Sequence, residues 1–227
     1  MNCRCAVLYN APMRRHVEWT LALCLLAGAP LAAQTSKADF ENDQVMIREK
    51  HGQPHDHKLN RVMVYVTDGG EILHYAGGKN EVLNWKAGQV KWSPASGMHT
   101  SEGTAKGPVM LVDIGIKTAG NPAKVAGGPL DPLRVDPKHF KLELENNQVR
   151  VLRLKLGPHE SAPMHENGLN HVVVLLTEAN LHEPSADGKA ELVQHKPADY
   201  FWSGPSKQKL ENLSDKPFEA IITEVKK

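Results

Sequence analysis

Apolar and polar positions alternate along short stretches of this chain, and a period of two residues predicts β-strands. The clearest stretch is 61–67, where three valines fall on one face and Met63 and Tyr65 fall on the other. No stretch carries a convincing helical period. Short strands joined by glycine-rich turns favour an all-β sandwich or barrel. The other strands expected in the first part of the chain are 45–47, 71–75, 82–85, 89–93, 99–102 and 109–116.

The strand pattern stops at residues 118–138 and then begins again. This stretch is rich in glycine and proline, a composition typical of a linker. Asp68-Gly69-Gly70 is expected to be a turn, and the polar stretch 178–188 is expected to be a connection. The strands expected after the linker are 140–144, 149–156, 171–177, 192–195, 200–202, 209–212 and 218–225.

Two parts of the sequence repeat one another. The stretch HDHKLNRV at 55–62 matches HENGLNHV at 165–172, and a Trp-Ser pair at 92–93 matches one at 202–203. Both matches have the same spacing between their copies. A fixed offset of this kind indicates an internal duplication, so we expect two similar β domains.

The first 33 residues follow a different pattern. A short basic segment, Met13–His16, precedes an apolar run from Trp19 to about Leu31, and small residues follow up to Ala33. This order is typical of a secretory signal peptide, with the functional start at Met13. A membrane anchor is the alternative, but the run is shorter than the roughly 20 residues that span a bilayer.

Export with cleavage near Ala33 predicts a periplasmic or secreted protein that has no contact with a membrane after cleavage. The expected divisions are a signal peptide at 1–33, a first domain at 34–117, a linker at 118–138 and a second domain at 139–227.

Composition narrows the class of protein. Of 227 residues, 41% are hydrophobic, which is enough for a packed core. The net charge is +1 without a basic stripe, so nothing points to nucleic acid. Cys3, Cys5 and Cys24 all precede the expected cleavage site, so the mature chain relies on its core or on a metal rather than on disulfides. No phosphate loop, nucleophile elbow or dinucleotide fingerprint is present.

Histidines gather just before the strand at 61–67. His55 and His57 are one residue apart, so an extended segment points both side chains to the same face. His99 is a third candidate. Three neutral imidazoles are a suitable ligand set for Fe, Zn, Ni, Cu or Mn, with open positions left for water or substrate.

These residues resemble the cupin family of small jelly-roll barrels. The first cupin motif, P-x-H-x-H-x(3,4)-E, is similar to the stretch Pro54–His57, and the second, G-x(5)-P followed by histidine, is similar to 88–94 with His99. The resemblance covers the whole mature chain and implies two tandem cupin barrels. It also implies that His55, His57 and His99 bind one divalent transition metal inside the first barrel, and it makes a homodimer possible.

The glutamate of the first cupin motif is missing, and Arg61 stands in its place. By strand parity Arg61 points to the same face as His57. A guanidinium keeps its proton and would repel a bound cation in a barrel interior. Arg61 therefore bends outward, pairs with an acidic residue, or binds an anionic ligand. Tyr65 and Trp92 are further candidates for ligand contact, although core packing is the simpler role for both.

The second repeat keeps fewer of these residues. His165 is retained, Asn167 replaces the second histidine, and His171 falls at the position of Arg61. The histidine of the second motif is absent, with Gln208 in its neighbourhood. We expect a vestigial site in a barrel that is kept for packing and shape.

Two main function classes remain. One is a metal-binding cupin whose first barrel binds or transforms a small anionic ligand oriented by Arg61. The other is a metal-free, non-catalytic barrel that captures a small solute. A structural role in assembly is a third class. The sequence names neither a substrate nor a reaction, because the cupin fold serves many functions.

Overall fold

The computed structural model describes residues 39–49, 55–124, 127–184 and 190–227. The predicted signal peptide at 1–33 and the start at Met13 lie outside these residues, as do the side chains of His55 and a few other residues beside the gaps. The described part of the chain is nearly all β, as the sequence predicts. Its one helix, α1 (Pro132–Val135), has four residues. No described helix is long and apolar enough to cross a bilayer.

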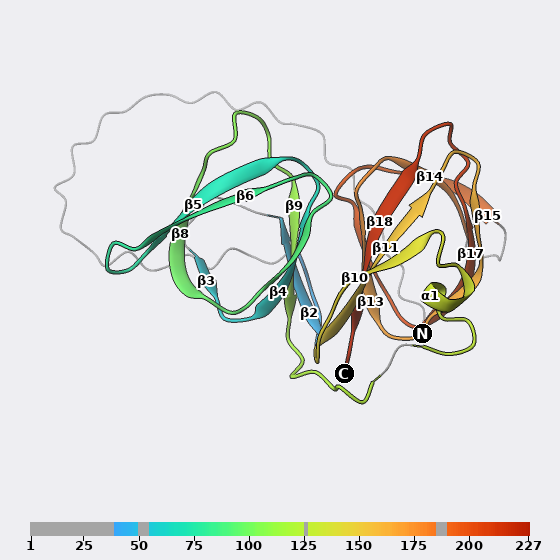
Figure 1. Ribbon diagram of the computed structural model, residues 1–227, viewed down its shortest axis with the longest axis horizontal. Coiled ribbons are helices and arrows are strands. Elements are labelled where there is room, and N and C mark those ends of the chain that lie inside the picture. Colours follow the sequence, from blue (N-terminus) through green and yellow to red (C-terminus); the bar gives the residue numbers. More distant parts are fainter. Residues whose placement is uncertain (1–38, 50–54, 125–126, 185–189) are drawn as a thin grey trace, which may run out of the picture. The chain divides into compact units, whose positions relative to one another are not determined.

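The first barrel consists of two antiparallel sheets (Figure 1). One has the strand order β1-β2-β9-β4-β7 and the other the order β3-β8-β5-β6. The strands are β1 (Phe40–Glu41), β2 (Val45–Glu49), β3 (His55–His57), β4 (Asn60–Tyr65), β5 (Gly69–Tyr75), β6 (Asn80–Trp85), β7 (Val90–Ser93), β8 (Gly97–Gly103) and β9 (Leu111–Ile116).

The second barrel repeats the first strand for strand. Its large sheet has the order β10-β11-β18-β13-β16, which is the order of the first sheet with nine added to each number. The pairs β12-β17 and β14-β15 repeat β3-β8 and β5-β6, and a bridge from Leu181 to Asn212 stands for the β5-β8 contact. The strands are β10 (Phe140–Glu145), β11 (Val149–Leu156), β12 (Ser161–Asn167), β13 (His171–Leu175), β14 (Ala179–Pro184), β15 (Ala190–His195), β16 (Tyr200–Ser203), β17 (Ser206–Glu211) and β18 (Phe218–Val225).

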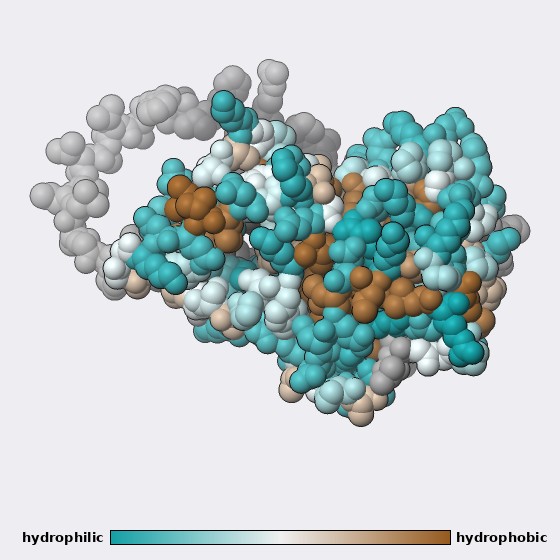
Figure 2. Space-filling view, viewed as in Figure 1, coloured by the Kyte–Doolittle hydropathy of each residue, from teal (hydrophilic) through white to brown (hydrophobic). Residues whose placement is uncertain are grey.

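The strand parity read from the sequence is confirmed by the packing. Met63 and Tyr65 face the interior of the first barrel with Trp85. Val62 and Val64 face the other way and are fully buried in an apolar cluster to which both large sheets contribute. The face seen in Figure 2 is mostly hydrophilic, with one apolar patch at the left and a band of apolar residues from the centre toward the right. Most of the β-branched residues therefore stabilise the fold from inside.

Three local predictions are wrong. Gly69 and Gly70 begin β5 rather than form a turn, and a Cβ on Gly69 would lie 2.7 Å from the ring of Trp85, so close packing explains this glycine. The stretch 178–188 contains β14, whose Ala179 and Leu181 are buried between polar neighbours. The short helix α1 was also missed, because a single turn capped by Asp131 is too short to show a helical period.

The predicted linker lies partly against the second barrel. Gln148 Nε2 donates a hydrogen bond to the carbonyl of Thr118 at 2.5 Å. Asp131 is buried and accepts two hydrogen bonds from Arg150 of β11, at 2.7 and 2.9 Å. The domain bounds drawn from composition stay a prediction.

Candidate ligand pocket

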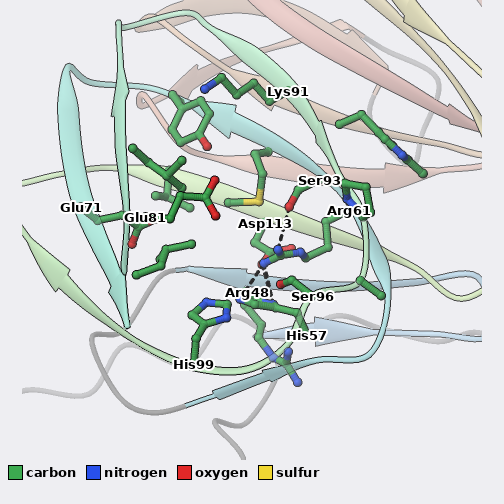
Figure 3. A pocket seen from close by; sticks show the side chains of 18 of the residues that line it. Arg48, His57, Arg61, Glu71, Glu81, Lys91, Ser93, Ser96, His99 and Asp113 are labelled. Carbon is green, nitrogen blue, oxygen red and sulfur yellow. Dashed lines mark hydrogen bonds and ion pairs between the residues drawn. The ribbon is translucent and has the colours of Figure 1, made fainter. Parts of the chain in front are cut away.

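A cavity of about 400 Å³ lies between the two sheets of the first barrel (Figure 3). Apolar side chains line part of it, among them Met63, Leu73 and Leu111. The volume falls within the range of roughly 300–1,000 Å³ typical of small-molecule sites. The polar residues that line it are Arg48, His57, Arg61, Tyr65, Glu71, Tyr75, Glu81, Lys91, Ser93, Ser96, His99 and Asp113.

Arg61 is the central cation of this cavity. Strand parity turns it inward from β4, and its side chain is only 9% exposed. Nη1 donates to Asp113 Oδ2 at 3.3 Å, and Nη2 donates to the hydroxyl of Ser93 at 2.7 Å. The register explains both contacts, since Arg61 pairs with Ser93 on β7 and with Gly115, two residues beyond Asp113, on β9. Arg61 therefore points inward and pairs with an acidic residue.

Arg61 also covers the edge of His57. Its Nη1 lies 2.5 Å from Nδ1 and 2.6 Å from Nε2 of that ring. Because a guanidinium only donates, the ring nitrogen that accepts carries no proton. His57 is therefore held neutral and is buried at 7% exposure.

The arrangement brings two of the three predicted ligands together. The rings of His57 and His99 lie 4.8 Å apart between centroids, and His55 pairs with His99 across β3 and β8. The side chain of His55 lies outside the described residues, so the three-histidine set stays a prediction.

The described residues do not fit a metal ion as they stand. A metal needs a ring lone pair at about 2.0–2.1 Å, but both nitrogens of His57 face Nη1 of Arg61. A cation there would lie beside a permanent positive charge in a buried site. No group of three or more His, Cys, Asp or Glu is placed to hold a metal among the residues that the structure describes.

The aromatic candidates divide between pocket and core. Tyr65 lines the cavity and stacks on Trp85 at 4.6 Å, and burial raises the pKa of its hydroxyl. Trp92 borders the cavity, but it also packs against the apolar cluster formed by the two large sheets. Their role in ligand binding stays a prediction.

Several residues of the cavity were not found by sequence reasoning. Asp113 interrupts the apolar run of β9, and a lone carboxylate inside a buried strand is a usable sequence signal. Glu71 shares a strand face with Leu73 and Tyr75. The alternation therefore showed on which face Glu71 lies, but it did not show which sheet that face packs against. Sequence alone did not indicate that these residues would face Arg61.

Comparison with known proteins places the fold. No model of a protein family matches the chain, and no curated protein matches it. AerE from Microcystis aeruginosa aligns over 82% of this chain and 89% of its own, at 13% identity and a TM-score of 0.55. Oxalate decarboxylase from Bacillus subtilis, a bicupin with Mn(II) centres, aligns over 80% of this chain and 69% of its own, at 10% identity and a TM-score of 0.51. This chain has the tandem cupin fold.

At these identities the likeness shows the fold alone. The shared fold confirms the all-β class and the two tandem barrels expected from the repeat. It names no ligand and no reaction for this chain. Function must therefore be argued from the residues of the pocket.

The second cupin barrel keeps its histidines in other roles. His165 pairs with Gln208 on β17, as His55 pairs with His99 on β8, so Gln208 occupies the place of the second-motif histidine. His165 Nδ1 donates to the carbonyl of Pro163, and its Nε2 lies 3.5 Å from Gln208 Nε2. Burial lowers the pKa of His165.

His171 and Asn167 complete the predicted vestigial set. His171 Nδ1 donates to the carbonyl of Leu169 at 2.9 Å, and burial lowers the pKa of this histidine too. Asn167 is fully buried, and its side-chain nitrogen and oxygen have no hydrogen-bond partner among the described residues. The vestigial character of the site stays a prediction.

The second barrel contains a cluster of buried charged residues, Arg150, Asp131 and Glu224. Glu224 stands where the first barrel has Gly115, and Arg150 donates to it at 3.2 Å while also binding Asp131. Burial raises the pKa of Glu224 to about 7, although Arg150 opposes this shift. The same strand framework thus holds a ligand-sized cavity in the first barrel and an internal ion cluster in the second.

Proposed function

We propose that the first barrel of this cupin binds a small organic anion, with the carboxylate of the ligand on Arg61, and that it does so without a metal. The observation that carries the proposal is a buried guanidinium that lines a ligand-sized cavity and covers the nitrogens of His57. A guanidinium fork matches the geometry of a carboxylate.

Arg61 has hydrogen-bonding capacity left for a ligand. Its Nε is buried and has no hydrogen-bond partner among the described residues. A buried donor without a partner costs roughly 1–3 kcal/mol. A carboxylate that accepts from Nε and Nη2 would recover that cost and form charge-assisted bonds.

The rest of the cavity selects an organic anion over an inorganic one. Met63, Leu73, Leu83 and Leu111 offer apolar surface near the polar groups. A ligand with a short hydrocarbon part buries that part against these side chains, at about 25 cal/mol for each Å² removed from water.

Removal of Arg61 tests the proposal. A panel of straight and branched carboxylates from acetate to hexanoate would be titrated into the chain starting at Gln34, after treatment with a chelator. We expect saturable binding that Arg61→Gln weakens by about 10–100-fold, the value of one charge-assisted interaction. Arg134→Gln, at an exposed position of α1, is the matched control.

Equal binding by the wild type and Arg61→Gln would contradict the proposal. Arg61→Lys controls for misfolding of the variant. It keeps the positive charge beside Asp113 and removes only the planar guanidinium that binds a carboxylate through two hydrogen bonds. Its affinity should fall between those of the other two proteins.

A second candidate is a divalent metal, Fe, Zn, Ni, Cu or Mn, on His55, His57 and His99. The contact between the rings of His57 and His99 favours it. It requires Arg61 to move away from His57. Elemental mass spectrometry of the untagged chain tests it: about one metal per chain that is lost in His99→Ala would support this candidate, and no metal after soaking in each ion would reject it.

We also propose that the protein is exported and cleaved near Ala33, on the evidence of the N-terminal sequence pattern. The intact mass of the protein recovered from the periplasm or the medium checks this point. The homodimer that the cupin resemblance makes possible stays a prediction, which light scattering on the mature chain would test.

A further inference from the structure

We infer that the ligand of the first barrel is a zwitterion: a small amino carboxylic acid whose ammonium group faces Glu71 while its carboxylate binds Arg61. The inference rests on the proposed anion site at Arg61 and adds the second charge. The observation behind it is the separation of charge between the two sheets that enclose the cavity.

One sheet supplies the positive wall. Arg48 from β2, Arg61 from β4 and Lys91 from β7 all line the cavity, with Asp113 from β9 as their single carboxylate. Arg48, Asp113 and Lys91 lie in one row across the sheet, through Met63 of β4. This wall carries an excess of positive charge even after Asp113 is paired with Arg61.

The other sheet supplies the negative wall. Glu71 from β5 and Glu81 from β6 line the cavity, and the same sheet also contributes His57 from β3 and His99 from β8. Glu71 is only 6% exposed. Glu81 is more exposed and accepts a hydrogen bond from the hydroxyl of Tyr75 at 3.2 Å. Figure 3 shows both carboxylates on the side of the cavity opposite Arg61 and Ser93.

A ligand with a single negative charge is attracted by the positive wall and repelled by the negative wall. Its carboxylate would gain from Arg61, but it would share the cavity with the buried Glu71, and like charges repel more strongly at a buried site than in water. A ligand with an ammonium group meets a charge of opposite sign at each wall. The apolar side chains between the walls accept its hydrocarbon part.

Matched sets of probes separate the two charges. Leucine, 4-methylpentanoate and 3-methylbutylamine share one hydrocarbon and carry both charges, the negative charge alone and the positive charge alone. Alanine with propanoate and ethylamine, and phenylalanine with 3-phenylpropanoate and 2-phenylethylamine, extend the test to smaller and larger ligands. Calorimetry on the chelator-treated chain from Gln34 measures all nine affinities.

In the set that fits the cavity best, the zwitterion should bind about 10-fold or more tightly than the acid, as expected for one charge-assisted interaction. Glu71→Gln, which keeps the shape of the side chain, should remove this preference, because it weakens binding of the zwitterion and relieves the repulsion that opposes the acid. Glu71→Asp should keep part of the preference, which separates lost charge from disturbed packing. Glu102→Gln, at an exposed position on β8, should keep all of it.

The outcomes distinguish the inference from the proposal beneath it. Acids that bind through Arg61 at least as tightly as their zwitterions would overturn the inference and leave the anion site standing. A preference that survives in Glu71→Gln would also overturn it. If none of the nine probes binds, or if Arg61→Gln binds them equally well, both the anion site and the zwitterion are rejected.

Discussion

Arg61 is the residue that most changes the chemistry of the cavity in the first barrel. It stands where the resemblance leads one to expect a glutamate, and its guanidinium lies against both nitrogens of His57. Strand parity alone predicted that Arg61 and His57 share a face. Its partner Asp113 lies 52 residues further along the chain and meets Arg61 only because β4 pairs with β9.

Glu224 makes the stability of the second barrel depend on pH. Burial raises its pKa from 4.5 to about 7 in the folded protein. The stability that a carboxyl with a raised pKa contributes is complete below pH 4.5 and is lost as the pH rises through 7. Between pH 5 and pH 8 the wild type should therefore lose up to about 3 kcal/mol relative to Glu224→Gln.

Urea unfolding of both proteins at these two pH values measures the difference. His171 and His165 have lowered pKa values and act in the opposite sense, losing stability as the pH falls, but they are common to both proteins and cancel. A difference in unfolding free energy that stays constant from pH 5 to pH 8 would show that Glu224 does not titrate there.

At the scale of elements, period-two alternation and the internal repeat predicted most of the strands. Each failure has its own cause. In β14 the buried Ala179 and Leu181 alternate with polar residues, so the strand has a polar mean composition. Glycines were taken for turns, although Gly69 serves the packing of Trp85. The charges on the two walls of the pocket could not be predicted, because the packing of one sheet against another leaves no local pattern in the sequence.

The buried valine face of β4 should tolerate no charge. Val64 is fully buried, so Val64→Asp places an unpaired carboxylate in the apolar cluster and should cost more than about 4 kcal/mol. Val82→Asp on β6, where the side chain is 63% exposed, is the matched control and should change stability by less than about 0.5 kcal/mol. Thermal melts that show equal effects would contradict the assigned parity.

Gly120 tests how the linker meets the second barrel. It has a φ of +87°, and a Cβ there would lie 2.4 Å from the carbonyl oxygen of Asn147. Gly77 has nearly the same φ, +85°, with open space around it. Gly77→Ala should cost about 1–2 kcal/mol for the backbone alone, and Gly120→Ala should cost at least about 1 kcal/mol more because of the clash. Equal losses in denaturant titration would show that the linker does not pack there.

At the scale of the whole molecule, the duplicated barrels are built alike and filled differently. The first barrel encloses a cavity with charged walls, whereas the second holds buried ions and histidines bonded to its own backbone. Buried residues of both large sheets form one apolar cluster, so each barrel covers apolar surface of the other. The second barrel thus stabilises the first, and the first encloses the cavity.

The central claim is that Arg61, rather than a metal, captures the ligand. The most direct measurement is calorimetric titration of 4-methylpentanoate or leucine into the chelator-treated chain from Gln34, repeated after addition of Mn, Fe, Zn, Ni or Cu. This account predicts one-site binding without metal, which added metal does not strengthen and which Arg61→Gln weakens by about 10–100-fold. Binding that begins only when a metal ion is supplied would contradict it.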